Sequence, residues 1–347
     1  YERTLKTSAP SFTKNFLSEH EHPLVKKIAK AREINKAHTT FIDTILRYEH
    51  KGRIHADINQ IRSDQGGTVT GRFSYSNPNL QQIPARNKDL GPMIRSLFIP
   101  EENCTWGCFD YSQQEPRLVV HFASTTAGIK EDPSVKEIVD NYASNDIDFH
   151  KTVADMAGID RIQAKTINLG LFYGMGKAKL QAELGLSTKQ EAEALFNQYH
   201  DRVPFVRNLM QETSRWASRE GEIRTLLGRG CRFNKWEPAQ FGMHTPMTWE
   251  DAVKKYGENR IRRAFTYKAL NKLIQGSAAD MTKKSMLDLY KEGIIAHIQI
   301  HDELDLSVES PEQAKKVVEI MENAVKLDVP NKVDYESGKN WGDIYDK

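Results

Sequence analysis

Apolar and polar residues alternate most clearly near the end of the chain, over positions 298–300 and again over 304–308. A period of two predicts strands that have one apolar and one polar face. The three residues between the two runs, His301, Asp302 and Glu303, are all polar. The pattern therefore predicts a β-hairpin with three polar side chains at its tip.

A further strand is predicted far upstream, where the apolar run 104–109 ends at Asp110. Helices are predicted on both sides of the hairpin. One covers about 260–291 and stops at Gly293. The other begins at Ser310-Pro311, because a serine cap followed by proline in the first turn favours a helix, and it extends to about residue 327.

The remaining segments differ in their composition and in the spacing of their apolar residues. The first fifty residues have apolar positions at helical spacing, whereas 51–100 are rich in Gly, Pro, Asn, Ser and Gln, which favours extended chain and loops. Residues 117–219 again have a helical pattern, with breaks near Asp132-Pro133 and Gly185, and 234–257 predict a long excursion. This order of elements predicts an α/β fold (mixed α+β), in which a helical domain interrupts the sheet.

Composition narrows the class of protein only a little. The 347 residues are 39% hydrophobic and 28% charged, with a net charge of +2, which is ordinary for a globular protein. No apolar run approaches the roughly 20 residues of a membrane helix, so we expect no membrane partner. Three cysteines are too few for a disulfide framework, and we expect buried thiols. Because the sequence begins with Tyr1 and not with Met, we expect a fragment or a processed product.

The candidate chemistry begins with Asp110 and Asp302, which both stand at ends of predicted strands. Carboxylates held on neighbouring strands can share two divalent cations about 3.5–4 Å apart, which is the arrangement for in-line phosphoryl transfer. Mg²⁺ suits such a site, since it prefers a few carboxylates together with waters and substrate phosphates. A single aspartate at a strand end is more often a turn former, so these residues alone leave a structural interpretation open.

A candidate phosphate-binding helix covers about 160–173. Arg161, Lys165, Leu169 and Tyr173 recur every four residues, and a drift of about 40° per step keeps them on one face. An arginine and a lysine beside an aromatic ring suit a triphosphate with a stacked base. A solvated amphipathic helix explains the same pattern and is the simpler interpretation.

Six short strings occur in order along nearly the whole chain from about Ser8. They are TGRFSYSNPNLQQIP (70–84), DYSQQEPR (110–117), RIQAKTINLGLFYG (161–174), TLLGR (225–229), QGSAAD (275–280) and HDE (301–303). In this order they closely resemble the family A DNA polymerases, the bacterial DNA polymerase I and phage replicase type. The short segment between His150 and Arg161 resembles the phage branch more than the bacterial one.

The resemblance implies a right-hand architecture with an antiparallel palm sheet, a large helical fingers insertion and a partial thumb. We therefore expect four regions: 1–50 as the end of the thumb, 51–117 as the first part of the palm, 118–262 as the fingers with the triphosphate helix 161–174, and 263–347 as the second part of the palm. The expected activity is template-directed addition of deoxynucleoside triphosphates to a primer 3′ end.

The resemblance also implies roles at the catalytic centre. Asp110 and Asp302 would bind two Mg²⁺ ions, with Mn²⁺ open as a substitute. Glu303 would support the metal site and, with His301, the primer terminus. Lys165 would protonate the departing pyrophosphate.

Further implied roles concern the incoming nucleotide and the DNA. The nucleotide contacts would come from one set of side chains: Arg161, Lys165, Leu169, Tyr173, Glu115, His150 and Gln113. Among these, Glu115 would be the steric gate that fills the space of a ribose 2′-hydroxyl. The DNA contacts would come from Arg72, Gln275, Asn271, His301 and Arg117. Arg72 and Gln275 would reach minor-groove acceptors, which every correct base pair presents alike.

Three departures from the family pattern limit these expectations. Leu169 stands where the family usually has Phe or Tyr, so we expect poor use of 2′,3′-dideoxynucleotides. Gln114 and Pro116 replace apolar residues in the Asp110 motif, and Pro116 must start the following helix without an N–H. The segment 234–260 is longer than in the bacterial pattern, and both a template or partner contact and a simple surface loop remain open.

Two alternative functions compete with DNA synthesis. A single-subunit RNA polymerase on the same fold is disfavoured by Glu115, since such an enzyme cannot block the 2′-hydroxyl. A nucleic-acid-binding fragment without catalysis remains open for a chain with little thumb. Expected partners are primer-template DNA and deoxynucleoside triphosphates, with a processivity factor or other replisome protein left open. We expect a monomer in the cytoplasm of a bacterial or phage-infected cell, with an organelle left open, and no proofreading exonuclease within the 347 residues.

Overall fold

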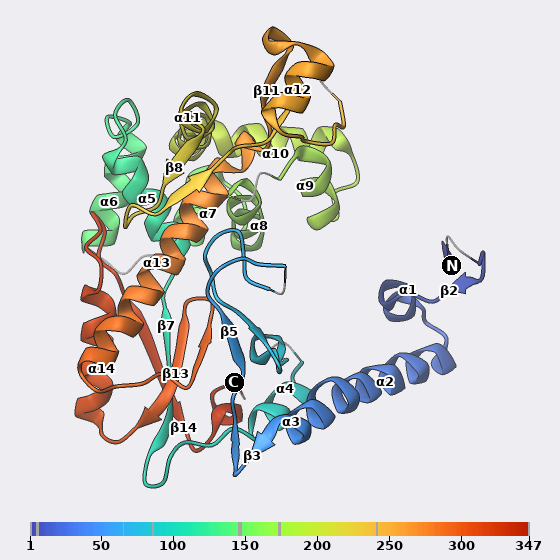
Figure 1. Cartoon of the computed structure of the whole chain (residues 1–347), viewed down its shortest axis with the longest axis vertical. Coiled ribbons are helices and arrows are strands. Elements are labelled where there is room, and N and C mark those ends of the chain that lie inside the picture. Colours follow the sequence, from blue (N-terminus) through green and yellow to red (C-terminus); the bar gives the residue numbers. More distant parts are fainter. Residues whose placement is uncertain are drawn as a thin grey trace.

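A four-stranded antiparallel sheet forms the centre of the computed structural model, in the order β12-β13-β7-β14. Its strands are β7 (Thr105–Tyr111), β12 (Ile298–Ile300), β13 (Glu303–Val308) and β14 (Val333–Gly338). The structure describes residues 2–4, 7–64, 66–84, 87–144, 148–172, 175–240 and 242–345. Figure 1 shows the sheet in the lower part of the molecule, with a group of helices above it.

Side chains alternate along these strands and so divide the hydrophobic core into two clusters. Phe109, Leu304 and Leu306 belong to the larger cluster, whereas Trp106 and Cys108 belong to a smaller one. The larger cluster also takes apolar residues from helices that include α5 (Gln114–Thr125), α13 (Ala269–Lys291) and α14 (Pro311–Asn323). The period of two in the sequence therefore corresponds to a sheet that is covered on both faces.

The first hundred residues form an extended arm and a set of short hairpins. The arm contains α1 (Lys14–Glu19), α2 (Pro23–Ala37), a π-helical segment (His38–Ile42) and α3 (Asp43–Tyr48). In Figure 1, α2 extends away from the sheet and carries α1, β1 (Glu2–Arg3) and β2 (Pro10–Ser11) at its far end. The following segment contains β3 (Glu49–His50), β4 (Arg53–Ile54), β5 (Asp57–Asn59), β6 (Ser74–Ser76), a 3₁₀ turn (Leu80–Gln82) and α4 (Leu90–Arg95).

The helix α4 was not expected from the loop-rich composition of its segment. The side chain of Asn87 accepts hydrogen bonds from the N–H groups of Asp89 and Leu90, which starts the helix. Ile94 is fully buried in the smaller core cluster. Capping and one buried position therefore outweigh the local composition.

The helical texture of 117–219 is confirmed. Six helices follow α5: α6 (Pro133–Ser144), α7 (Phe149–Ala157), α8 (Arg161–Phe172), α9 (Lys177–Glu183), α10 (Lys189–Arg202) and α11 (Pro204–Glu220). The breaks lie where they were expected, since α6 begins directly after Asp132 and Gly185 takes a φ of +63° between α9 and α10. No helix in the described part of the chain is long and apolar enough to cross a membrane.

The predicted helix over 260–291 is wrong at its start, because 261–263 form a strand. The region before α13 contains β8 (Glu222–Arg224), β9 (Gly230–Arg232), β10 (Trp236–Pro238), α12 (Trp249–Tyr256), a 3₁₀ turn (Glu258–Arg260), β11 (Ile261–Arg263) and a second 3₁₀ turn (Thr266–Lys268). β10 pairs with β11, and the Arg263 guanidinium lies over the Trp236 ring at 4.6 Å from its centroid. The long excursion is therefore a folded unit, which projects at the top of Figure 1.

The last helix is also shorter than predicted. Its start is as expected, since the Ser310 side chain accepts the N–H of Gln313 and proline occupies the first turn. It ends at Asn323, and the Asn331 side chain donates to the carbonyl oxygens of Glu322 and Val325 around that end. A 3₁₀ segment (Trp341–Tyr345) closes the described chain.

Candidate active site

Two of the predicted carboxylates meet at the end of the β7–β13 pair. Glu303 lies directly opposite Asp110 in the ladder, and the backbone N–H of Tyr111 donates to the carbonyl oxygen of Asp302 at 3.3 Å. The connecting turn is tighter than expected, because Ile300 pairs with Glu303 and only two residues lie between the strands. The hairpin therefore places Asp302 beside Asp110, although the two are far apart in the sequence.

Three carboxyl groups, those of Asp110, Asp302 and Glu303, lie close enough at this end of the sheet to affect one another's charge. Burial, followed by the charges of Asp302 and Glu303, raises the pKa of Asp110 to about 8. Burial also raises the pKa of Asp302 to about 6, against the opposing effect of Arg72. The Oδ1 atom of Asp110 is buried and has no hydrogen-bond partner among the described residues. The raised pKa values mean that negative charge on these carboxyl groups is unfavourable without a nearby positive charge. A hard divalent cation that prefers oxygen ligands would supply that charge and a partner for the buried oxygen.

A second acidic group lies on the same strands. One ligand atom each of Cys108, Glu303 and Asp305 lie within 4.8 Å of one another. Asp305 is fully buried, and its Oδ1 accepts a hydrogen bond from the Trp106 Nε1 at 3.0 Å. Burial raises the pKa of the Cys108 thiol well above its usual range, so a cation here would first have to displace a proton. This chemistry makes the group a weaker candidate for Mg²⁺ than the carboxylates of Asp110 and Asp302.

The expectation that all three thiols are buried is wrong for one of them. Cys108 and Cys231 are buried, whereas Cys104 is half-exposed, and all three are free. Cys104 lies just before β7, where its chain has not yet entered the sheet.

The first turn of α5 places Glu115 against Arg72. The Arg72 Nη2 lies 2.6 Å from the Glu115 Oε1, and the two side chains are only 21% and 11% exposed. Pro116 is compatible with this helix because α5 begins at Gln114, so proline falls in the first turn, where its missing N–H has no intrahelical partner. The charges of Arg72 and Glu115 both act on Asp302, so this ion pair lies near the carboxylates of Asp110 and Asp302.

Two residues of the DYSQQEPR string point into the protein. Arg117 is 2% exposed and donates to the carbonyl oxygens of Ser112 and Pro330 at 2.8 and 2.5 Å. This geometry engages the guanidinium in the fold, and the expected DNA contact of Arg117 stays a prediction. The Gln113 Oε1 accepts the N–H of Phe149 at 2.6 Å, so this side chain holds the start of α7.

The predicted triphosphate helix is α8, and its cations differ in their surroundings. Arg161 donates through Nε and Nη2 to one carboxylate oxygen of Asp148, at 2.6 and 2.5 Å. Lys165 is exposed and forms no ion pair with any residue in the described part of the chain. Leu169 is half-buried against the larger core cluster. Tyr173 lies outside the described residues.

The other predicted contacts lie on α7, on α13 and at the hairpin turn. His150 is buried at the start of α7, and burial lowers its pKa to about 4. Asn271 and Gln275 lie half-buried, about one turn apart on α13. His301 occupies the turn with a φ of +57°, and its pKa is lowered by burial and by the nearby charge of Arg72.

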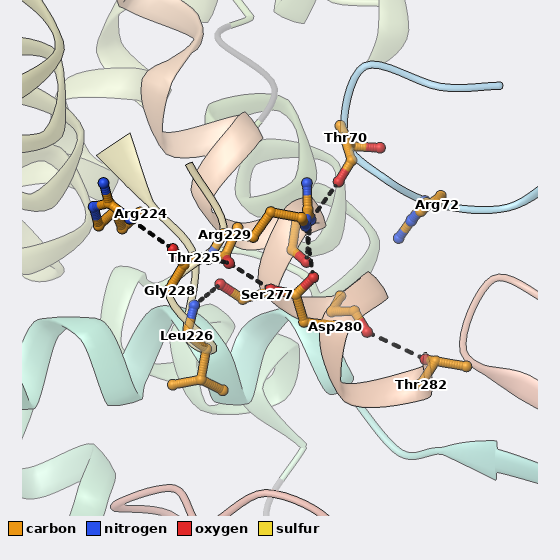
Figure 2. Close-up of polar contacts among 12 residues, drawn as sticks. Thr70, Arg72, Arg224, Thr225, Leu226, Gly228, Arg229, Ser277, Asp280 and Thr282 are labelled. Atoms are coloured by element: carbon orange, nitrogen blue, oxygen red, sulfur yellow. Dashed lines mark hydrogen bonds and ion pairs between the residues drawn. The ribbon is translucent and has the colours of Figure 1, made fainter. Parts of the chain in front are cut away.

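Arg229, the last residue of the string TLLGR, was given no role from the sequence, and it joins three of the motif strings. Figure 2 shows Arg229 between Thr70, on the TGRFSY loop, and Asp280, on α13. Its guanidinium donates to the carbonyl oxygens of Thr70 and Gly276 at 2.7 and 2.9 Å and to the Asp280 Oδ1 at 2.8 Å. The Thr225 hydroxyl donates to the other oxygen of Asp280. This network fixes the loop that carries Arg72 to the helix that carries Gln275.

The same network explains two glycines in the strings. Gly71 has a φ of +83°, and a Cβ there would lie 2.7 Å from the Arg229 Cζ. A Cβ on Gly276 would lie 2.7 Å from the Thr225 Cγ2. Gly71 belongs to the string TGRFSYSNPNLQQIP and Gly276 to QGSAAD, but their long-range contacts with residues of TLLGR leave no periodic signal in the sequence.

An antiparallel sheet with carboxylates clustered at one end, and a helical insertion that carries Arg161 and Lys165, defines a polymerase palm with its fingers. The comparison with known families agrees, since the model of DNA polymerase family A matches residues 2–343. The chain belongs to DNA polymerase family A.

Similar proteins come from phages and bacteria. The chain is 34% identical to the DNA-directed DNA polymerase of Pseudomonas phage M6, over 96% of this chain and 53% of that protein. It is 35% identical to the thermostable DNA polymerase I of Thermus filiformis, over 98% of this chain and 39% of that protein. A solved POL domain of Pol1 from M. smegmatis, in complex with DNA primer-template and dNTP, superposes with a TM-score of 0.76 at 28% identity, covering 99% of this chain and 58% of that one. The chain thus spans about half, or less, of the length of these curated relatives.

Proposed function

We propose that this chain is a template-directed DNA polymerase that adds deoxynucleoside triphosphates to a primer 3′ end by two-metal-ion phosphoryl transfer. The observation that carries the proposal is the meeting of Asp110 and Asp302, with a buried carboxylate oxygen that has no partner among the described residues. The family implies divalent metal use, and the all-oxygen donor set favours Mg²⁺, with Mn²⁺ as a substitute.

In this proposal Asp110 and Asp302 hold the cations, and Glu303 supports them from the opposite strand. When bound, the pair of cations lowers the pKa of the primer 3′-hydroxyl and stabilises charge on the α-phosphate and pyrophosphate. His301 supports the primer terminus from the turn beside Asp302. The protein's own part is to hold these groups rigidly at the end of paired strands.

The triphosphate is held from α7 and α8 by Arg161, Lys165 and His150. Lys165, which has no ion-pair partner among the described residues, is the side chain free to give a proton to the departing pyrophosphate. Leu169 lies against the sugar, and Tyr173 closes on the nascent base pair. Gln113 contributes by holding the first turn of α7 in place.

The ion pair of Arg72 and Glu115 supports selection of deoxyribonucleotides. A side chain held at 2.6 Å by a partly buried arginine cannot move aside easily for a 2′-hydroxyl, so Glu115 serves as the steric gate. Arg72 and Gln275 read the geometry of the base pair from the minor groove, and Asn271 and Arg117 support that network. Ribonucleotide extension as fast as deoxyribonucleotide extension would instead favour the RNA polymerase alternative.

The proposed regions are those expected from the sequence: 1–50 as the end of the thumb, 51–117 and 263–347 as the palm, and 118–262 as the fingers. The proposed partners are primer-template DNA and deoxynucleoside triphosphates, which the M. smegmatis POL domain holds in its complex. The proposal gives no exonuclease to this chain, places it in the cytoplasm of a bacterial or phage-infected cell, and leaves a processivity factor to be tested by binding.

The decisive experiment is primer extension with Mg²⁺, comparing the wild type with Asp302→Asn. The control is Glu319→Gln, which changes an exposed carboxylate on α14. We expect a loss of at least about a hundredfold in extension rate for Asp302→Asn, with primer-template binding by fluorescence anisotropy retained, and no loss for Glu319→Gln. Equal extension by the wild type and Asp302→Asn would remove the metal assignment.

A further inference from the structure

Three buried polar side chains form a chain of hydrogen bonds across α10, α8 and α7. Tyr199 and Asn168 are 0% exposed and His150 is 8% exposed. The Tyr199 hydroxyl lies 2.5 Å from the Asn168 Oδ1, and the Asn168 Nδ2 lies 3.1 Å from the His150 Nδ1. Each helix contributes one group, so the chain connects the candidate phosphate contact on α7 to the middle of α8 and to α10.

The chemistry of these groups fixes the direction of each hydrogen bond. An amide oxygen carries no hydrogen, so the Tyr199 hydroxyl must be the donor to Asn168. The amide nitrogen has no lone pair to offer, so Asn168 must donate to His150. The Nδ1 of His150 is therefore the acceptor, and the proton of a neutral ring must reside on Nε2.

The opposite orientation of the Asn168 amide is less favourable. It would direct the amide nitrogen at Tyr199, and the phenolic hydrogen would lose its acceptor. Tyr199 is fully buried and has no other hydrogen-bond partner in the described part of the chain. A buried hydroxyl without an acceptor costs free energy, so the orientation that satisfies all three groups is preferred.

We propose that Tyr199, acting through Asn168, holds His150 as the neutral Nε2–H tautomer, so that this N–H donates to a phosphate oxygen of the incoming triphosphate. The proposal rests on the proposed polymerase function. Tyr199 and Asn168 are then positioning residues for the reaction, since they act only through His150. The Nε2 atom has no hydrogen-bond partner among the described residues, so it is available to a substrate.

The surroundings of His150 favour a neutral ring. Burial, assisted by the charges of Lys165 and Arg161 and opposed by Asp148, lowers the pKa of His150 to about 4. The Asp148 side chain caps α7 through the N–H of His150 and also binds Arg161. A neutral ring can donate from one nitrogen only, so its tautomer decides whether it attracts or repels a phosphate oxygen.

The tautomer can be measured directly by NMR on protein labelled with ¹⁵N-histidine, with the His150 signals assigned from their loss in His150→Gln. We expect a protonated Nε2 and an unprotonated Nδ1 in the wild type. Asn168→Asp should reverse the tautomer, because a carboxylate can only accept from Nδ1. Tyr199→Phe should give a mixture, since the Asn168 amide is no longer held. A wild-type signal from a protonated Nδ1 would overturn the proposal, even if every variant failed to fold.

A matched control removes a buried phenolic hydroxyl elsewhere. Tyr75 is buried in β6, and its hydroxyl accepts the N–H of Gln299 at 3.2 Å. Tyr75→Phe should leave the His150 signals unchanged. An equal change in Tyr75→Phe and Tyr199→Phe would mean general loosening of the fold and would overturn the proposal.

Kinetics supply an independent test. Tyr199→Phe should raise the KM for the incoming nucleotide about three- to tenfold in single-nucleotide extension, with a smaller change in kcat. In a His150→Gln background the same substitution should have no further effect, whereas additive effects would contradict the proposal. Absence of extension by the wild type would refute the polymerase function but leave the NMR result standing, so the two failures are distinguishable.

Discussion

The hydrogen bonds of Arg229 form a joint between the TGRFSY loop, which carries Thr70 and Arg72, and α13. The substitution Arg229→Ala tests whether this joint stabilises the palm. The substitution removes three hydrogen bonds, to Thr70, Gly276 and Asp280. It also leaves the carboxylate of Asp280, which is 8% exposed, without its cation. The Thr225 hydroxyl remains as a partner of Asp280, so the loss is large but not complete.

The expected magnitude follows from burial. Breaking a buried ion pair by removing one partner costs about 3–5 kcal/mol. The Arg229 side chain is 37% exposed, so solvent screens part of this interaction, and we expect a loss of about 2–3 kcal/mol in the free energy of unfolding. The loop that carries Arg72 should also become less well held.

The free energy of unfolding is measured by urea unfolding followed by circular dichroism. The transition midpoints of the wild type and the variants are compared, with the same slope of free energy against urea concentration for each. Arg224→Ala is the matched control. Arg224 lies on the same hairpin and appears beside Arg229 in Figure 2, but it is 68% exposed and pairs with Glu222 at the surface. It should change the free energy of unfolding by less than about 0.5 kcal/mol.

A double-mutant cycle completes the test. With Asp280→Asn as the second change, Arg229→Ala should show a coupling energy of about 1–2 kcal/mol, because the two side chains are in contact. Equal destabilisation by Arg229→Ala and Arg224→Ala, or strict additivity of the Arg229 and Asp280 changes, would refute the role given to this joint.

Two further predictions concern the catalytic centre. Leu169 offers no ring or hydroxyl to the sugar, so the wild type should need a high dideoxynucleotide ratio for chain termination, and Leu169→Tyr should lower that ratio by roughly three- to tenfold; efficient termination by the wild type at low ratios would contradict this. Folding raises the pKa values of Asp110 and Asp302 from 3.8 to about 8 and about 6. In the absence of cations, the contribution of these two carboxyl groups to the free energy of unfolding should therefore be most favourable below pH 3.8. It should be lost as the pH rises through about 6 and 8. Mg²⁺ should therefore raise the Tm more above pH 8 than below pH 6, and an equal rise on both sides, measured by calorimetry, would show that these carboxylates do not bind it.

Local patterns predicted a large part of the fold. The alternation over 298–308 indicated the hairpin, and Ser310-Pro311 indicated the start of α14, because strand faces and helix caps are set by residues close together in sequence. The positions of Asp110 and Asp302 at the ends of apolar runs also made their meeting an expectation. By contrast, the strand β11 follows from pairing with β10, which no local pattern records.

The burial of Arg117 and the joint at Arg229 could not be predicted for a related reason. A motif string shows that an arginine is present, but its partners are backbone carbonyl groups, and these exist at every position of every sequence. Arg117 binds the carbonyl oxygen of Pro330, and Arg229 binds that of Thr70, both more than a hundred residues away. Only the folded chain determines which carbonyl group faces which guanidinium.

The cations of the candidate site also depend on residues outside the family strings. Arg161 is held by Asp148, whose other contacts are the first N–H groups of α7, so one carboxylate connects the cap of α7 to the start of α8. Substrate phosphates must therefore share Arg161 with Asp148, whereas Lys165 has no such competitor among the described residues. Under the proposed function, the two cations of the same helix face would therefore have different tasks: Arg161 is preorganised for binding, and Lys165 keeps the freedom that transfer of a proton to a leaving group requires.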